Sequence, residues 1–233
     1  MRYSDDIKSR FTARHRVCIE FSDAVRTKEM LDVGCWIGWY EKFMVKKGCK
    51  FIVGMDLDRS ALRKAKKSFS EDRCEFVRGS ARKLPFKPND FDAVSMFDVL
   101  EHLPAGSEFD AFSEANRMLN AGGSLLVSVP NDRSIIKLLD PAYFLTGHRH
   151  YSFDRLSGLM EKMGFDIYEV RYGGGFAEAL SMVFLYLFKH LFDMEVPFKS
   201  FLEDLRNKEY QGKGFATVFV KATLKPKSNF SRN

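Results

Sequence analysis

The sequence lacks several features that would assign it to a specialised class of protein. Its 233 residues contain no internal repeat, no low-complexity tract and no apolar run at the N-terminus, so we expect no repeat protein, signal peptide or membrane anchor, and a cytoplasmic location. The four cysteines form no Cys-x-x-Cys pair and the histidines are not clustered, which argues against a disulfide framework or a metal site. We therefore expect free thiols at Cys18, Cys35, Cys49 and Cys74, and no metal ligands.

The composition suits one α/β domain with an appended element, because 45% of the residues are hydrophobic and can form a sizeable core. The net charge is +6, and nine of the basic residues lie within 59–83, where only three acids accompany them. Such a surface can attract RNA or anionic lipid. No aromatic-rich nucleic-acid motif accompanies it, so we expect a solvated helix face and no specific nucleic-acid binding.

One stretch near the N-terminus has the pattern of a strand, a turn, a helix and a second strand. The strands are expected at 30–33 and 51–55, with a glycine turn at 34–38 and a helix at 39–47 between them. Asp56 follows the second strand, about 20 residues past the turn, where an acid can accept hydrogen bonds from ribose hydroxyls. This pattern predicts a ligand that contains a nucleoside.

The glycine spacing in this turn differs from that of dinucleotide-binding proteins. The chain has Asp32-x-Gly34-x-x-x-Gly38, not Gly-x-Gly-x-x-Gly, and tryptophans stand where two of those glycines would fall. A carboxylate at position 32 would repel a pyrophosphate but could attract an ammonium group. The spacing therefore favours a nucleoside that carries an amino-acid moiety.

The segment LDVGCWIG (31–38) resembles the first motif of class I S-adenosylmethionine (SAM) dependent methyltransferases, in which an acid precedes Gly-x-Gly-x-Gly. Further segments resemble later parts of the same family: GSARKLPF (79–86), FDVLEHL (97–103) and the helix-containing 148–167. The resemblance covers roughly residues 29–170. It implies SAM as cofactor, S-adenosylhomocysteine as product, and methyl transfer by direct in-line displacement to a small-molecule, possibly hydrophobic or lipid-like, acceptor.

The resemblance also implies which residues bind the cofactor. These are Asp32, Gly34, Cys35, Trp36, Gly38, Asp56, Leu57, Ser80, Ala81, Phe97 and Asp98. Two positions depart from the family pattern, because Trp36 replaces the middle glycine and Ser80 replaces an acid that commonly meets the adenine amino group. The departures leave a second function class open, a non-catalytic SAM-binding regulator, and an apolar segment described below leaves a third, an interaction protein.

Candidates for catalysis and substrate binding lie after the fourth and fifth strands. His102 follows Glu101 just past a strand end, where an imidazole can act as a base at neutral pH or simply stabilise the turn. His148, His150 and Tyr151 are expected on a loop over the same face, as substrate contacts or as surface residues. A base is needed only when the methyl acceptor carries a proton, so no catalytic dyad is required.

The expected fold is a Rossmann-like, seven-stranded, mostly parallel sheet with helices on both faces. An amphipathic helix at 7–26 should precede the sheet, covering the cofactor site or the sheet edge. The expected organisation is an N-terminal helical cap (1–28), a SAM-binding domain (29–174), a helical insertion or lid (175–214), a last strand of the domain (215–226) and a basic tail (227–233).

The insertion begins with an unusually apolar segment at 176–192, in which thirteen of seventeen residues are apolar or aromatic. It is slightly shorter than the roughly 20 residues that span a bilayer, and it lies between two strands of one sheet, so we expect no transmembrane helix. Three interpretations stay open: a buried intradomain helix, a homodimer interface, and a lid that contacts a hydrophobic substrate or a membrane surface.

Overall fold

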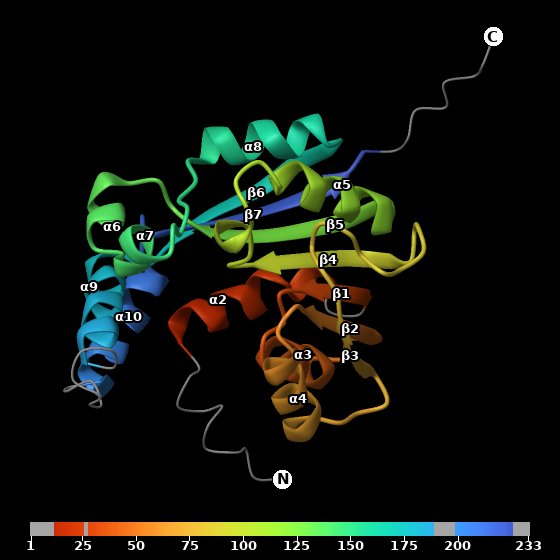
Figure 1. Cartoon of the computed structure of the whole chain (residues 1–233), viewed down its shortest axis with the longest axis horizontal. Helices are drawn as coiled ribbons and strands as arrows, with labels where there is room; N and C mark the ends of the chain where they lie inside the picture. The colour runs from red at the N-terminus through yellow and green to blue at the C-terminus, as the bar shows by residue number, and fades with distance from the viewer. Residues whose placement is uncertain (1–11, 26–27, 189–198, 226–233) are drawn as a thin grey trace.

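The computed structural model describes residues 12–25, 28–188 and 199–225. Seven strands form one sheet in the order β3-β2-β1-β4-β5-β7-β6 (Figure 1). The strands are β1 (Glu29–Val33), β2 (Phe51–Asp56), β3 (Cys74–Arg78), β4 (Phe91–Phe97), β5 (Leu119–Pro130), β6 (Phe165–Gly173) and β7 (Thr217–Leu224). Only β7 is antiparallel to its neighbours, β5 and β6. The predicted seven-stranded, mostly parallel sheet is confirmed.

Helices cover both faces of the sheet. The elements are α2 (Ala13–Phe21), η1 (Asp23–Val25), α3 (Trp39–Lys46), α4 (Arg59–Ser68), η2 (Leu100–His102), α5 (Glu108–Met118), α6 (Ser134–Leu138), α7 (Pro141–Leu145), α8 (Phe153–Lys162), α9 (Phe176–Tyr186) and α10 (Lys199–Gln211). One core cluster joins the sheet to α5 and α8, and a second joins its other face to α2, α3 and α4 (Figure 1). The inner strands β1, β2, β4 and β7 are buried on both sides, which explains their largely apolar sequences, whereas the edge strands β3 and β6 are partly exposed.

The direction of chain progression reverses between β1 and β4. From β1 the chain adds β2 and then β3 on one side, whereas β4 and β5 lie on the other side. In an open α/β sheet the carboxyl ends of the strands leave a crevice at such a reversal, and ligands bind there. The loops that follow β1, β2 and β4 are therefore the part of the fold that positions a site.

The N-terminal helix is shorter than the sequence pattern suggested. The helix α2 ends at Phe21, where the Ser22 hydroxyl donates to the carbonyl of Cys18, and the 3-10 helix η1 follows. The end of the expected helix at 26 is therefore wrong, while its predicted start at 7 lies outside the described residues, as do 26–27 of the cap and the tail at 227–233. All four cysteines are free, as expected.

The insertion before the last strand is helical, as predicted, and consists of α9 and α10 in the described residues. Residues 189–192 of the apolar segment lie outside them. Among the described helices, none is both long and apolar enough to cross a membrane. Two short helices, α6 and α7, were not predicted. The second begins with Pro141 after Asp140, whose carboxylate caps the helix by accepting from the Ala142 N–H at 2.9 Å.

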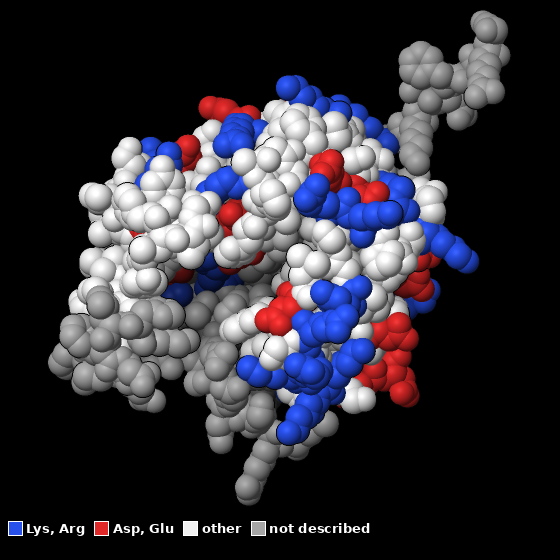
Figure 2. Space-filling view, viewed as in Figure 1, with Lys and Arg blue, Asp and Glu red and all other residues white. Residues whose placement is uncertain are grey.

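The basic residues of 59–83 that lie on α4 form a solvated helix face, as expected. On α4 the buried positions are Ala61, Leu62 and Ala65, while the lysines and arginines of this helix are exposed. Figure 2 shows Lys and Arg gathered over this part of the surface. Asp58 caps the helix by accepting from the N–H groups of Ser60 and Ala61 at 2.7 and 3.3 Å.

Candidate functional site

A cavity of about 490 Å³ opens at the reversal point of the sheet. Its walls come from the carboxyl ends of β1, β2 and β4, from the loops after β3 and β4, and from α2. The lining residues are His15, Cys18, Val33, Gly34, Trp36, Trp39, Met55, Asp56, Leu57, Gly79, Ala81, Phe97, Asp98, Val99, His102 and Leu103. Seven of the eleven predicted cofactor residues are among them. His15 and Cys18 show that α2 covers this cavity, which the sequence left open.

The glycine turn after β1 requires glycine at two positions. Gly34 has φ +83°, and a Cβ atom there would lie 2.5 Å from a methyl carbon of Val99. Gly38 has φ +76°, and its Cβ would lie 2.6 Å from the ring of Phe76. Both positions thus combine left-handed backbone with a close neighbour, and only glycine satisfies both demands. Gly34 lines the cavity, whereas Gly38 begins α3.

Trp36 lies at the middle of this turn with φ +47°, a left-handed conformation that is unusual for a tryptophan. The backbone there explains why the family favours glycine at this position. The indole is 42% exposed and lines the cavity, so it is not a core anchor. It forms part of the rim that a ligand would meet.

Asp56 joins the end of β2 to the glycine turn. Its two carboxylate oxygens accept hydrogen bonds from the backbone N–H groups of Trp36 and Asp58, each at 2.8 Å. The first bond holds the unusual turn conformation at Trp36. Each oxygen keeps a second lone pair, and Asp56 lines the cavity, so the carboxylate can still accept from a ligand hydroxyl.

Asp32 lies beneath the turn and is not among the residues that line the cavity, so its contact with an ammonium group stays a prediction. Its carboxyl is buried and accepts from the Ser95 hydroxyl at 2.5 Å. Burial raises the pKa of Asp32 to about 7. Burial and then the charge of Asp32 raise the pKa of Glu41, a fully buried acid on α3 whose side chain lies against Gly54. This carboxyl pair could not be predicted from the sequence, because Glu41 has the pattern of a surface residue on a helix.

Asp98, which follows β4, is held by Arg14 of α2. The Arg14 guanidinium donates to Asp98 at 2.9 Å, to Glu178 of α9 at 3.0 Å and to the hydroxyl of Tyr210 on α10 at 3.1 Å. Burial would raise the pKa of Asp98, but the charge and hydrogen bond of Arg14 outweigh it, so the pKa is lowered. Arg14 thus fastens the N-terminal helix and the insertion to the edge of the cavity, a role that the sequence did not reveal.

Three other predicted cofactor residues do not line the cavity. Cys35 is buried to 1% exposure, and burial raises the pKa of its thiol. Ser80 forms an isolated bridge with Lys83, while its neighbours Gly79 and Ala81 line the wall. Gly38 shapes the turn from behind. For these residues the structure supports a structural role beside the cavity.

The loop predicted to carry substrate contacts is largely buried. Tyr151 is fully buried, and its hydroxyl donates to the carbonyl of Leu100 and to the carboxylate of Glu108, both at 3.0 Å. His150 is also buried, with Nε2 2.9 Å from Asp140. The expectation of a polar loop over the open face is therefore wrong for both residues. They hold the loop in place.

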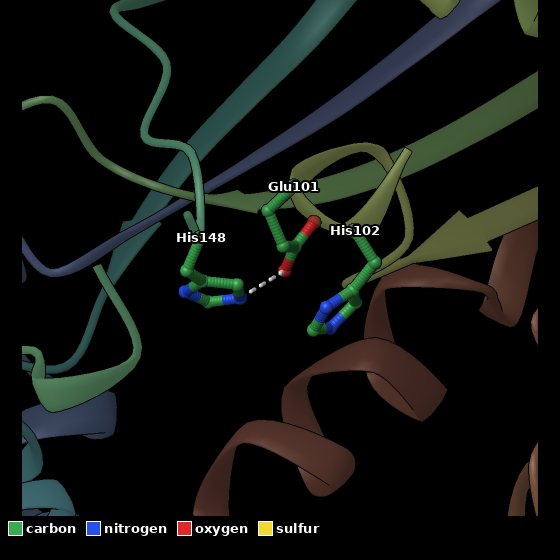
Figure 3. A group of neighbouring side chains, drawn as sticks. All are labelled: Glu101, His102 and His148. Atoms are coloured by element: carbon green, nitrogen blue, oxygen red, sulfur yellow. Dashed lines mark ion pairs between the residues drawn. The ribbon is translucent and has the colours of Figure 1, made fainter. Parts of the chain in front are cut away.

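His102 and His148 lie at a second cavity of about 390 Å³, which η2 and the loop at 146–149 enclose. His102 lines both cavities. Glu101 points between the two imidazoles (Figure 3). Burial, and then the charge of His148, lower the pKa of His102. Figure 2 shows this face of the molecule hollowed near its centre, with charged atoms at the floor.

Comparison with known proteins agrees with the geometry of the first cavity. Residues 31–127 match a family described as "Methyltransferase domain". A probable S-adenosylmethionine-dependent methyltransferase of Mycolicibacterium smegmatis is 28% identical over 154 residues, which are 65% of this chain and 58% of that protein. The match to the methyltransferase family thus covers the part of the chain from β1 into β5. The glycine turn, Asp56 and the loop after β4 all lie inside it.

One further curated protein and one solved structure are also similar to this chain. A sterol 24-C-methyltransferase of Gibberella zeae is 30% identical over 119 residues, which are 49% of this chain and 31% of that protein. The chain thus spans about a third to somewhat over half of these curated relatives. The solved structure of an S-adenosylmethionine dependent methyltransferase from Mesorhizobium loti has a TM-score of 0.61 at 15% identity, covering 84% of this chain and 91% of that one. It shows the shared fold.

Proposed function

We propose that the chain binds SAM in the cavity at the reversal point and transfers its methyl group to a small, largely hydrophobic acceptor. One observation carries the proposal: the glycine turn after β1, Asp56 after β2 and the loop after β4 line one cavity of about 490 Å³. A cavity of this size suits a cofactor-sized ligand.

The contacts follow from the chemistry of each wall. Asp56 would accept from the ribose hydroxyls of bound SAM, and the apolar Leu57 and Ala81 would border its adenine. Phe97 and Asp98 line the same cavity, and the Asp98 carboxylate would complement the positive charge of the sulfonium. Helix α2 closes this side with His15 and Cys18, which reduces the access of water.

Methyl transfer needs alignment more than acid–base chemistry, because the sulfonium already supplies a good leaving group. The acceptor atom attacks the methyl carbon in line with the breaking C–S bond, and the electron pair of that bond stays on sulfur. His102 is the predicted base for a protonated acceptor, and it lines the cofactor cavity and the second cavity alike. An acceptor entering through the second cavity would therefore reach the methyl group beside His102.

A hydrophobic acceptor is supported by the surface of the insertion. Helix α9 exposes Phe176, Leu180, Phe184 and Leu187, which recur on one side of the helix. The sterol methyltransferase among the relatives acts on a hydrophobic molecule, as its name states. The same apolar side could instead contact a membrane surface or a second copy of the chain.

Calorimetric titration with S-adenosylhomocysteine tests the cofactor site. Wild type should bind it, and Asp56→Ala should weaken binding by about 1.5–3 kcal/mol through lost charged hydrogen bonds. Asp58→Ala is the matched control. It removes a helix cap two residues away, so it should lower stability by about 1 kcal/mol and leave the affinity unchanged. Equal effects of the two variants, or no binding by wild type, would refute the site.

Turnover is tested by mass spectrometry of acceptors incubated with SAM. A panel should pair sterols, quinols and fatty acids with polar molecules that carry the same nucleophilic group. We expect product only from the hydrophobic members. Binding of the cofactor without product from any member would favour the non-catalytic alternative.

A further inference from the structure

Glu101, His102 and His148 place three potential metal ligands together at the second cavity (Figure 3). One ligand atom from each residue lies within 4.8 Å of the others. The His102 and His148 rings are 4.8 Å apart between centroids, and Glu101 Oε1 is 3.9 Å from His148 Nε2. Two ligands of one tetrahedral zinc-type ion lie about 3.4 Å apart, so a small side-chain rotation would bring these atoms onto an ion.

The carboxyl of Glu101 lacks the partners that a buried acid normally has. The residue is 2% exposed, and its Oε2 makes no hydrogen bond to the described residues. A buried carboxyl without partners is costly, and a bound cation is one of the few groups that satisfies it.

His148 is oriented by a second carboxylate. Its Nδ1 lies 2.7 Å from Asp140 Oδ2, so a proton on Nδ1 leaves the lone pair of Nε2 facing Glu101. A carboxylate behind a histidine is the usual arrangement around metal-bound imidazoles, because it fixes the tautomer and the ring orientation.

The backbone around the cluster is held firmly. Arg149 donates to the Leu100 carbonyl at 2.7 Å and to Glu108 at 2.6 Å, and Glu108 also accepts from Tyr151. These bonds tie the loop that carries His148 to the 3-10 helix that carries Glu101 and His102. Ligands from two distant parts of the chain are thereby presented in a fixed arrangement.

We infer that Glu101, His102 and His148 bind one divalent transition-metal ion of the zinc type. Two imidazoles and one carboxylate are a common donor set for such ions, with further coordination positions left for water or substrate. Asp140, His148 and His150 form a competing group. Asp140 already bonds to both of its histidines there, and His150 is fully enclosed, so that group lacks an open position.

The position of the site indicates which class of methyl acceptor would bind to the ion. This part of the inference rests on the proposed function. His102 borders the cofactor cavity, so a hydroxyl or enol oxygen bound to the ion would lie beside the transferred methyl group. The ion lowers the pKa of that oxygen, whose proton leaves to water. The oxygen–methyl bond forms as the methyl–sulfur bond breaks, with the electron pair retained by the sulfur.

Metal binding is measured on the full chain after chelation and dialysis. Titration with Zn²⁺, followed by elemental analysis, should give one tightly held ion per chain, and Co²⁺ should give a visible absorption band. Mg²⁺ should bind more weakly, because it prefers oxygen ligands. Absence of a stoichiometric ion would overturn the inference.

Single variants identify the ligands. His102→Ala changes an exposed side chain and should fold normally, yet it should weaken Zn²⁺ binding more than Asp140→Asn, for which we expect about a 10–100-fold loss. Glu101→Gln should act like His102→Ala. His15→Gln, a histidine elsewhere on the cofactor cavity, is the matched control and should bind Zn²⁺ as wild type. Wild-type Zn²⁺ affinity in His102→Ala, or its loss only in His150→Asn, would contradict the assignment.

Titration of S-adenosylhomocysteine on the same samples separates this inference from the proposed function. Binding of S-adenosylhomocysteine without a stoichiometric ion would overturn the metal site alone. A bound ion without any binding of that ligand would overturn the proposed function and leave the metal site standing.

Discussion

The sheet and the insertion bury opposite kinds of side chain. In β1, Met30, Leu31 and Val33 are at most 2% exposed, and the surrounding helices cover them. Among the described side chains of α9, those at 9% exposure or less are Ala177, Glu178, Ala179 and Ser181, whereas Phe176, Leu180 and Phe184 are exposed. Glu178 is paired with Arg14 and Arg206 inside the molecule. The sheet is held by apolar packing, and the insertion is fastened by a buried ionic network.

The difference shows why polarity alone does not reveal which side of a helix faces inward. A helix that carries one well-placed acid can turn that acid toward two arginines, and its apolar residues are then left for another contact. A buried ion pair adds little net stability, but removing one partner leaves an uncompensated charge. The insertion should therefore be sensitive to charge removal and tolerant of changes to its apolar side.

Among the variants that test this difference, removal of Arg14 should lower the unfolding free energy most. Arg14→Met leaves Asp98 and Glu178 without their shared partner, so we expect a loss of about 3–5 kcal/mol in unfolding free energy. Arg16→Met, an exposed arginine on the same helix, should change it by less than about 0.5 kcal/mol. Urea denaturation measures both. Similar small effects would mean that the network does not fasten the insertion.

A matched pair of leucines tests the packing of the two regions directly. Leu31→Ala empties a fully buried site in β1 and should lower the unfolding free energy by about 2–5 kcal/mol. Leu180→Ala changes a side chain that is 43% exposed, and we expect less than about 0.5 kcal/mol. A large effect of Leu180→Ala that depends on protein concentration would indicate that a second copy covers α9.

The buried carboxyl in the sheet should respond to pH in the opposite sense to the ionic network. The folded pKa of Asp32, about 7, lies above its ordinary 3.8. Stability therefore falls as the pH rises from about 4 to 7, where only the unfolded state ionises, and the loss is complete above pH 7. Asp32→Asn should stabilise the protein by on the order of 2 kcal/mol at pH 8, and by much less at pH 4. Asp98→Asn should instead destabilise it at neutral pH, because the pKa of Asp98 is lowered. Urea titrations at both pH values distinguish these signs.

Trp36 should have only a small effect on stability, since it is an exposed residue on the turn after β1. Trp36→Gly removes the strain of the left-handed backbone but raises the conformational entropy of the unfolded chain. The two effects oppose each other, so the unfolding free energy should change by less than about 1 kcal/mol. Calorimetry should show equal or tighter binding of S-adenosylhomocysteine. A loss of several kcal/mol in stability would contradict the placement of the indole on the rim.

The sequence predicted the first strands of the sheet well because they are buried on both faces and end at recognisable turns. The strands expected at 30–33 and 51–55 are found at Glu29–Val33 and Phe51–Asp56, so each differs by one residue at one end. The glycine turn and Asp56 could be found because local spacing dictates their geometry. Local sequence patterns therefore predict the glycine turn and Asp56.

Long-range contacts account for what the sequence could not show. Arg14, Glu41 and Glu178 acquire their roles only when distant elements meet, so no local spacing marks them. The same holds for His102 and His148, whose separation in the chain made them look unclustered and led to the expectation of no metal site. The burial of Tyr151 was missed because a polar loop sequence gives no indication that Glu108 will meet it.

The cavity also gives the protein an optical probe of its own. The chain has two tryptophans, Trp36 and Trp39, and both line the cavity. The ring of Trp39 contacts that of His15 in a tilted arrangement, with 4.1 Å between ring centroids. Intrinsic tryptophan fluorescence therefore originates entirely at the walls of one cavity, and its change on adding a ligand reports occupancy of that cavity without any label.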